Sequence, residues 1–162
     1  MENKRLDIVG IIPAAGCASR ISPIPCSKEI YPIGIQKTGG KPKIKVATSD
    51  LIESFSLAGA NQVYMIIRKG KWDIPQYLGL GEPANSLAYI VTDPTEGTHQ
   101  TIDLAYPFVK DKLVLLGFPD ILFKPRNAHE LLIDKQTKTD ADVVLGLFKT
   151  DNHKKADMVE ID

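Results

Sequence analysis

The chain has 162 residues, of which 43% are hydrophobic and 25% are charged, and its formal net charge at pH 7 is zero. This length suits one domain with a real core, the balanced charge is not typical of a general nucleic-acid-binding protein, and no apolar run approaches the length of a membrane span. The charged N-terminus MENKRLD has no signal-peptide region, and there are only two cysteines. We therefore expect a cytoplasmic location, no membrane association and no disulfide framework.

Strand-like and helix-like segments alternate along the chain. The first strand is expected over 7–13, and a helix over 48–58 ends at Gly59, a typical stop signal. The further segments predict strands over 62–67, 88–91, 112–117 and 143–149, a last strand beginning at 158–161, and helical segments over 74–80, 102–109 and 127–135. In the segment 102–109, Ile102, Ala105, Tyr106 and Val109 form an apolar stripe, and Pro107 should bend or end the helix. The alternation predicts an α/β fold, a Rossmann-like three-layer α/β/α arrangement around a mostly parallel central sheet.

The stretch 10–34, which reads GIIPAAGCASRISPIPCSKEIYPIG, carries the strongest functional signal. An apolar strand ends in a loop of small residues, so backbone N–H groups of that loop can approach an anionic ligand closely. Arg20 and Lys28 follow and supply two positive charges. This pattern indicates phosphate binding; the alternative is that both are ordinary solvated surface charges.

Further candidate positions come from the later loops. Asp120 follows the apolar strand 112–117, where a carboxylate can hold Mg²⁺ against phosphates, or can simply cap the next turn. Thr98, after Gly97, precedes a helix, where it can face a ligand or act as the helix N-cap. The segment 41–45 (KPKIK) is expected to be a solvated loop rather than an anion-binding patch. The three histidines lack the spacing of zinc ligands.

These motifs, taken together and in this order, resemble those of the sugar-1-phosphate nucleotidyltransferases. AAGCASR followed by SKEIYPIG is similar to the amino-terminal signature of that family. The segment KPKIKVATSDLIESFSLAGANQVYMII resembles its helix, Gly turn and second strand, and TEGTHQTIDLAYPFV resembles its Gly-Thr segment beside the nucleoside. LVLLGFPDILF resembles its strand that ends in a metal-binding Asp, and ADMVEID resembles the start of a later strand.

The resemblance implies an enzyme that transfers a nucleotidyl group from a nucleoside triphosphate, dTTP or UTP, to a sugar-1-phosphate and releases pyrophosphate. It implies Arg20 and Lys28 as catalytic residues, acting on the leaving pyrophosphate and the α-phosphate, and Asp120 as a ligand of Mg²⁺, the expected cofactor. The nucleotide-binding residues that it implies are Ala14, Ala15, Gly16, Cys17, Ala18, Ser19, Thr92, Gly97 and Thr98. The expected partners are the two substrates, and a homo-oligomer is left open.

Some positions depart from the pattern of the family. Ala18 replaces the second glycine of the loop, the interval between Arg20 and Lys28 is two residues shorter than in the thymidylyltransferases, and Thr92 stands where members that read uracil or thymine often have Gln. The family chain normally continues beyond the equivalent of Asp162. We therefore expect residues 1–162 to form a single nucleotidyltransferase-like domain truncated at its C-terminal end. The alternative is a non-catalytic nucleotide-binding or regulatory domain that retains the fold.

Overall fold

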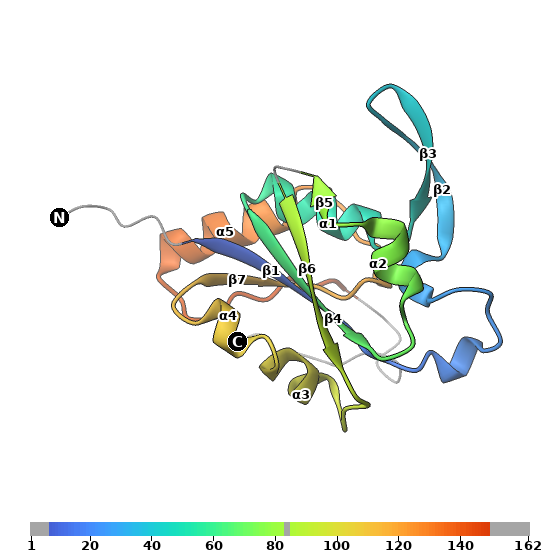
Figure 1. Cartoon of the computed structure of the whole chain (residues 1–162). Coiled ribbons are helices and arrows are strands. Elements are labelled where there is room, and N and C mark those ends of the chain that lie inside the picture. The colour runs from blue at the N-terminus through green and yellow to red at the C-terminus, as the bar shows by residue number, and fades with distance from the viewer. Residues whose placement is uncertain (1–6, 83–84, 150–162) are drawn as a thin grey trace.

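The computed structural model describes residues 7–82 and 85–149, and its centre is a five-stranded sheet with the order β5-β6-β4-β1-β7 (Figure 1). Four strands run parallel: β1 (Ile8–Ala14), β4 (Gln62–Arg68), β6 (Asn85–Thr92) and β7 (Leu113–Leu116). The short β5 (Gly81–Glu82) pairs antiparallel with β6. The expected strands in the first three-quarters of the chain are thus confirmed, as is the mostly parallel sheet.

Helices cover both faces of the sheet, because the strands are apolar on both faces and alternate side chains point to opposite sides. On one face, α1 (Ser49–Leu57), α2 (Asp73–Leu78) and α5 (Ala128–Thr139) lie over a core that includes Ile12, Met65 and Phe55. On the other face, α3 (Thr98–Asp103) and α4 (Tyr106–Val109) pack over a smaller core around Val9 and Ile66. The three-layer α/β/α architecture is therefore confirmed.

Gly10, in the middle of β1, allows α1 to approach the sheet closely. A Cβ added at this glycine would lie 2.4 Å from Cδ2 of Phe55, a fully buried side chain. A glycine within a strand weakens the strand but permits such an approach. Helix α1 ends as expected, because Gly59 adopts a φ of +87° directly after it.

The segment 41–45, expected to be a solvated loop, is instead part of a β-hairpin. Strand β2 (Pro32–Thr38) pairs antiparallel with β3 (Lys41–Val46), and the hairpin extends away from the central sheet (Figure 1). Gly39 and Gly40 form its tip, with φ angles of +56° and +78°. Positive φ at both central residues is typical of the tight turns that join paired strands, so the two glycines make the hairpin possible.

The strand predicted over 143–149 is wrong. The segment 143–149 forms no strand, and Val143, Leu145 and Phe148 are 72%, 62% and 76% exposed. An apolar run becomes a strand only when another strand pairs with it, and none of the strands within 7–82 and 85–149 does so. In the expected stripe, Ala105 and Val109 are buried, Ile102 packs against them and Tyr106 is 58% exposed. The expected helix is interrupted at 104–105, and Pro107 lies in the first turn of α4. The expected strand at 158–161 lies outside the described residues.

Among the helices of the described part of the chain, none combines the length and the apolar character that a bilayer crossing requires. Cys17 and Cys26 are both free thiols, in agreement with the expected lack of a disulfide framework.

A buried histidine joins α5 to α1. The Nδ1 atom of His129 lies 2.8 Å from Oγ of Ser54, and its ring contacts the edge of the Phe55 ring at a centroid distance of 4.7 Å. Burial lowers the pKa of His129, and a hydrogen bond to the backbone of Leu116 only partly opposes this effect. The neutral ring thus satisfies both nitrogens, with Nδ1 accepting from Ser54 and the other nitrogen donating to Leu116.

We expect the free energy of unfolding to decrease as the pH falls below about 6.5, since the unfolded chain then binds a proton that folded His129 does not. The slope from this one group is at most about 1.4 kcal/mol per pH unit. Urea unfolding between pH 7.5 and 5.5 measures it. His129→Gln should remove the slope, whereas His99→Gln, at an exposed position, should retain it; equal slopes in all three proteins would contradict the assignment.

Candidate functional site

The polar loops after the parallel strands enclose one cavity. Because β1, β4, β6 and β7 run in the same direction, their carboxyl ends meet at one edge of the sheet, the edge at which open α/β sheets bind ligands. A cavity of about 310 Å³ lies there. It is lined by Pro13, Ala15, Gly16, Cys17, Lys28, Glu29, Pro94, Thr95, Gly97, Thr98, Thr101, Phe118 and Asp120.

The first wall of the cavity is the loop that follows β1. Gly16 and Cys17 are exposed to the cavity, and Cys17 Sγ accepts a hydrogen bond of 2.9 Å from Nη1 of Arg68, at the end of β4. Ala18 has a φ of +54°, a left-handed conformation that costs a residue with a Cβ roughly 1–2 kcal/mol. The loop therefore keeps the backbone shape of a glycine while it carries an alanine.

An ion pair connects the first wall to the loop after β7. Nζ of Lys28, the first residue of η2 (Lys28–Ile30), lies 2.7 Å from Oδ2 of Asp120. Partial burial raises the pKa of the Asp120 carboxyl, but the hydrogen bond and the charge of Lys28, together with the charge of Arg20, outweigh burial and hold this pKa below its usual value. Asp120 is thus ionised at neutral pH and paired with Lys28.

The donor set suits magnesium only in combination with phosphates. No group of three or more His, Cys, Asp or Glu side chains that could hold a metal occurs in the described part of the chain. Mg²⁺ is commonly bound by one or two carboxylates, with phosphate oxygens and water completing its shell. Asp120, half-exposed at the cavity, fits a magnesium ion that arrives with a phosphate ligand.

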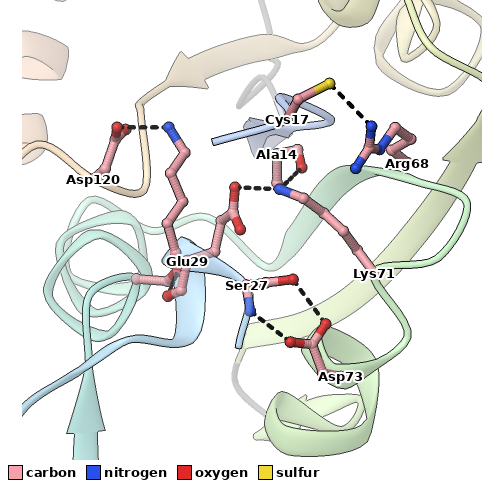
Figure 2. A network of polar contacts seen from close by, with 10 residues as sticks. Ala14, Cys17, Ser27, Glu29, Arg68, Lys71, Asp73 and Asp120 are labelled. Carbon is pink, nitrogen blue, oxygen red and sulfur yellow. Dashed lines mark hydrogen bonds and ion pairs between the residues drawn. The ribbon is translucent and has the colours of Figure 1, made fainter. Parts of the chain in front are cut away.

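A buried network beneath the cavity holds the first wall in place (Figure 2). Nζ of Lys71 donates to Oε1 of Glu29 at 2.7 Å and to the carbonyl oxygen of Ala14 at 2.8 Å. Glu29 is fully buried, and its Oε2 has no hydrogen-bond partner. Lys71 therefore links the end of β1, the start of η2 and the turn after β4.

Sequence reasoning missed this network. Glu29 and Lys71 are 42 residues apart, and both residue types usually lie on the surface. The available signal for the network was the position of Glu29, which directly follows the predicted site residue Lys28 and precedes the buried Ile30. Thr101 was also missed; it lines the cavity, and its Oγ1 lies 2.7 Å from Oγ1 of Thr95 in the same segment after β6.

The structure brings most, but not all, of the sequence-predicted residues together. Seven of them line the cavity: Ala15, Gly16, Cys17, Lys28, Gly97, Thr98 and Asp120. The other five, Ala14, Ala18, Ser19, Arg20 and Thr92, are not in its wall. Ala14 and Thr92 end β1 and β6, and Ser19 and Arg20 form part of the exposed helix η1 (Ser19–Ile21).

Thr98 is not the N-cap of α3, which was one of the two interpretations of this position. The helix begins at Thr98, Gly97 precedes it as the cap residue, and no side chain caps the helix through a hydrogen bond. Thr98 is exposed and faces the cavity. The geometry therefore leaves its hydroxyl available to a ligand.

Solved structures with a similar fold include a thymidylyltransferase and UDP-glucose pyrophosphorylases. A Bacillus anthracis protein described as a glucose-1-phosphate thymidylyltransferase, in complex with sucrose, has 24% identity and a TM-score of 0.68, over 81% of this chain and 50% of that chain. A UTP-bound UGPase from Acinetobacter baumannii has 16% identity and a TM-score of 0.72, over 84% and 54%. A UDP-glucose pyrophosphorylase complexed with UDP-glucose has 16% identity and a TM-score of 0.65, over 83% and 55%.

The chain thus has a sugar-1-phosphate nucleotidyltransferase-like fold, as the sequence motifs predicted, and its matched part spans about half the length of these structures. No protein-family model and no curated protein matches it.

Ala18→Gly should raise the free energy of unfolding by about 1 kcal/mol, because glycine adopts a positive φ without the strain caused by a Cβ. Urea unfolding at pH 7.5 measures the change. Ala15→Gly is the matched control, since Ala15 is buried and is not among the residues with positive φ; it should lower stability by roughly 0.5–1 kcal/mol. A loss of stability in Ala18→Gly would contradict the strain.

Proposed function

We propose that this chain binds a nucleoside triphosphate, dTTP or UTP, in the cavity and transfers its nucleotidyl group to a sugar-1-phosphate, with release of pyrophosphate. The observation that carries the proposal is the Lys28–Asp120 ion pair of 2.7 Å, which lies beside a small-residue loop at the carboxyl edge of a nucleotidyltransferase-like sheet. A cation and an anion held together at the wall of one cavity are two groups that phosphoryl chemistry with Mg²⁺ uses.

The roles follow from the charges that develop on the phosphates. The oxygen of the sugar phosphate attacks the α-phosphorus, and the bond from that phosphorus to the bridging oxygen of pyrophosphate breaks. The backbone amides of residues 16–19 would cradle the phosphates. Arg20 would neutralise the leaving pyrophosphate, and Lys28 would contact the α-phosphate or the attacking group.

We assign the nucleoside contacts to the cavity-lining segment after β6, residues 94–101, and to the end of β1. Gly97 and Thr98 would lie along the nucleoside, and the backbone of Ala14 and Ala15 would pass near the base. Thr92, the last residue of β6, would lie near the base, although it is not in the wall of the cavity. Asp120 would hold Mg²⁺, which supplies charge neutralisation on the phosphates when it is bound.

A second candidate is a nucleotide-binding domain without turnover. The observation in its favour is Ala18, which carries a Cβ at a φ of +54° in the loop that would cradle the phosphates. A domain of this kind would retain the loop, Lys28 and Asp120 and would bind a nucleotide without releasing pyrophosphate. The two candidates therefore differ in turnover and not in nucleotide affinity.

Nucleotide titration with and without Mg²⁺, combined with a pyrophosphate-release assay using glucose-1-phosphate, tests the proposal. We expect Arg20→Ala and Asp120→Ala each to weaken the binding of Mg²⁺·dTTP or Mg²⁺·UTP by about 10- to 100-fold, since each removes a charged contact of roughly 1.5–3 kcal/mol. Lys41→Ala, at an exposed position in the hairpin, should have no effect.

The two readouts separate the candidates. Pyrophosphate release that depends on Asp120 supports the transferase. Binding without release, weakened by Arg20→Ala, supports the second candidate. No binding of any of the four common nucleoside triphosphates would contradict both.

Alkylation of Cys17 provides an independent test of the cavity. Cys17 is exposed and lines the cavity, whereas burial, and then the charges of Asp73 and Glu29, raise the pKa of Cys26. Because the thiolate is the reactive form, N-ethylmaleimide should modify Cys17 faster than Cys26. Saturating Mg²⁺·UTP or Mg²⁺·dTTP should slow the modification of Cys17 at least about tenfold and leave that of Cys26 unchanged, as mass spectrometry of Cys17→Ser and Cys26→Ser controls would show. Equal rates at Cys17 with and without nucleotide would place the nucleotide elsewhere.

A further inference from the structure

We infer that the turn between β4 and α2 positions Lys28 through Lys71 and Asp73, so that both are positioning residues for the reaction. The inference rests on the proposed function, in which Lys28 contacts a phosphate. Neither Lys71 nor Asp73 was predicted from the sequence motifs as part of the site.

The turn holds the residues on both sides of Lys28. Asp73, the first residue of α2, accepts two hydrogen bonds from Ser27: 2.6 Å from the backbone N–H to Oδ2, and 2.8 Å from the hydroxyl to Oδ1. Lys71 donates to Glu29 at 2.7 Å and reaches the carbonyl oxygen of Ala14. The residue before Lys28 and the residue after it are therefore both bound to the segment 71–73, where the turn after β4 enters α2.

With the residues on both sides of it held, Lys28 extends its side chain to Asp120. Figure 2 shows Ser27 against Asp73 on one side of the network and Asp120 on the other. Lys28 Nζ reaches Asp120 at 2.7 Å across the cavity. The backbone at Glu29 is fixed as well, because the hydroxyl and the N–H of Thr48 both donate to the Glu29 carbonyl oxygen, at 2.5 and 3.1 Å.

Substitutions of Lys71 and of Asp73 differ in their expected cost to the stability of the fold. Glu29 is fully buried and has one unpartnered oxygen, so loss of Lys71 alone would leave a buried carboxylate without a counter-ion, a change that strongly destabilises proteins. Asp73 is only partly buried, and its removal spares the core. Asp73→Ala is therefore the first variant to test. The double variant Glu29→Leu/Lys71→Met removes both charges of the buried pair and is the second.

The position of the Lys28 ammonium can be followed without a nucleotide. Reductive ¹³C-methylation of the full chain gives one NMR signal for each lysine, the Lys28 signal being the one absent in Lys28→Arg. The variant Asp120→Asn serves as the reference, because it shows the chemical shift of the Lys28 signal when the ion pair with Asp120 is lost. We expect Asp73→Ala and the double variant, both folded by circular dichroism, to move the Lys28 signal toward its position in Asp120→Asn. Asp73→Asn, which retains one acceptor oxygen for Ser27, should give an intermediate shift.

Asp50→Ala is the matched control, because Asp50 also pairs with a lysine, Lys45, but away from the cavity. It should not move the Lys28 signal. Asp73→Ala should also weaken the binding of Mg²⁺·UTP or Mg²⁺·dTTP by up to about 10- to 100-fold, the effect expected when Lys28 loses a charged contact with a phosphate.

The outcomes distinguish failure of the inference from failure of the proposed function. An unchanged Lys28 signal in folded Asp73→Ala, or in the folded double variant if Asp73→Ala does not fold, overturns the positioning role even if nucleotide binds. A shifted signal together with no nucleotide binding by the unaltered chain supports positioning of the ion pair and overturns the proposed function. A shifted signal with weakened binding supports both.

Discussion

The buried ion pair between Lys71 and Glu29 is the contact on which the geometry of the cavity depends. It lies beneath the loop that follows β1, and Lys71 also binds the carbonyl oxygen of the last residue of that strand. Removing two charges from water is unfavourable unless they pair and form further hydrogen bonds. Each charge is therefore stable only when the other is in place, and this mutual requirement couples the first loop to the turn after β4.

The chemistry of the cavity follows from that coupling. The turn holds Ser27 and Glu29, Lys28 lies between them, and its ammonium meets Asp120 from the loop after β7. Parallel strands alone would bring these loops to one edge of the sheet. The network adds orientation, because it directs one cation toward one carboxylate where a phosphate and a magnesium ion would bind. A preorganised arrangement of charges is what transfer of a nucleotidyl group requires of a protein.

The loop after β1 has a left-handed backbone conformation at Ala18, a position where glycine would be expected. Ala18 keeps a left-handed conformation although glycine would adopt it without strain, so the tertiary contacts around the loop maintain its shape. The nearby hydrogen bond from Arg68 to Cys17 ties the loop to β4 on its other side. Two bonded positions, Ala14 at one end and Cys17 in the middle, thus hold a loop whose own sequence does not favour its shape.

The amino-acid sequence by itself determined the elements whose signals are local. Apolar runs bounded by glycine and by polar loops predicted β1, β4, β6 and β7, and the order of the loop motifs predicted the nucleotidyltransferase-like fold together with Lys28 and Asp120 at the cavity. Only the tertiary structure decided the pairing of Glu29 with Lys71 and of Ser27 with Asp73, and the absence of a strand over 143–149. A buried charge is stable only with a partner and an apolar run forms a strand only beside another strand, and the partners of Glu29 and Ser27 are 42 and 46 residues away, beyond the reach of any local pattern.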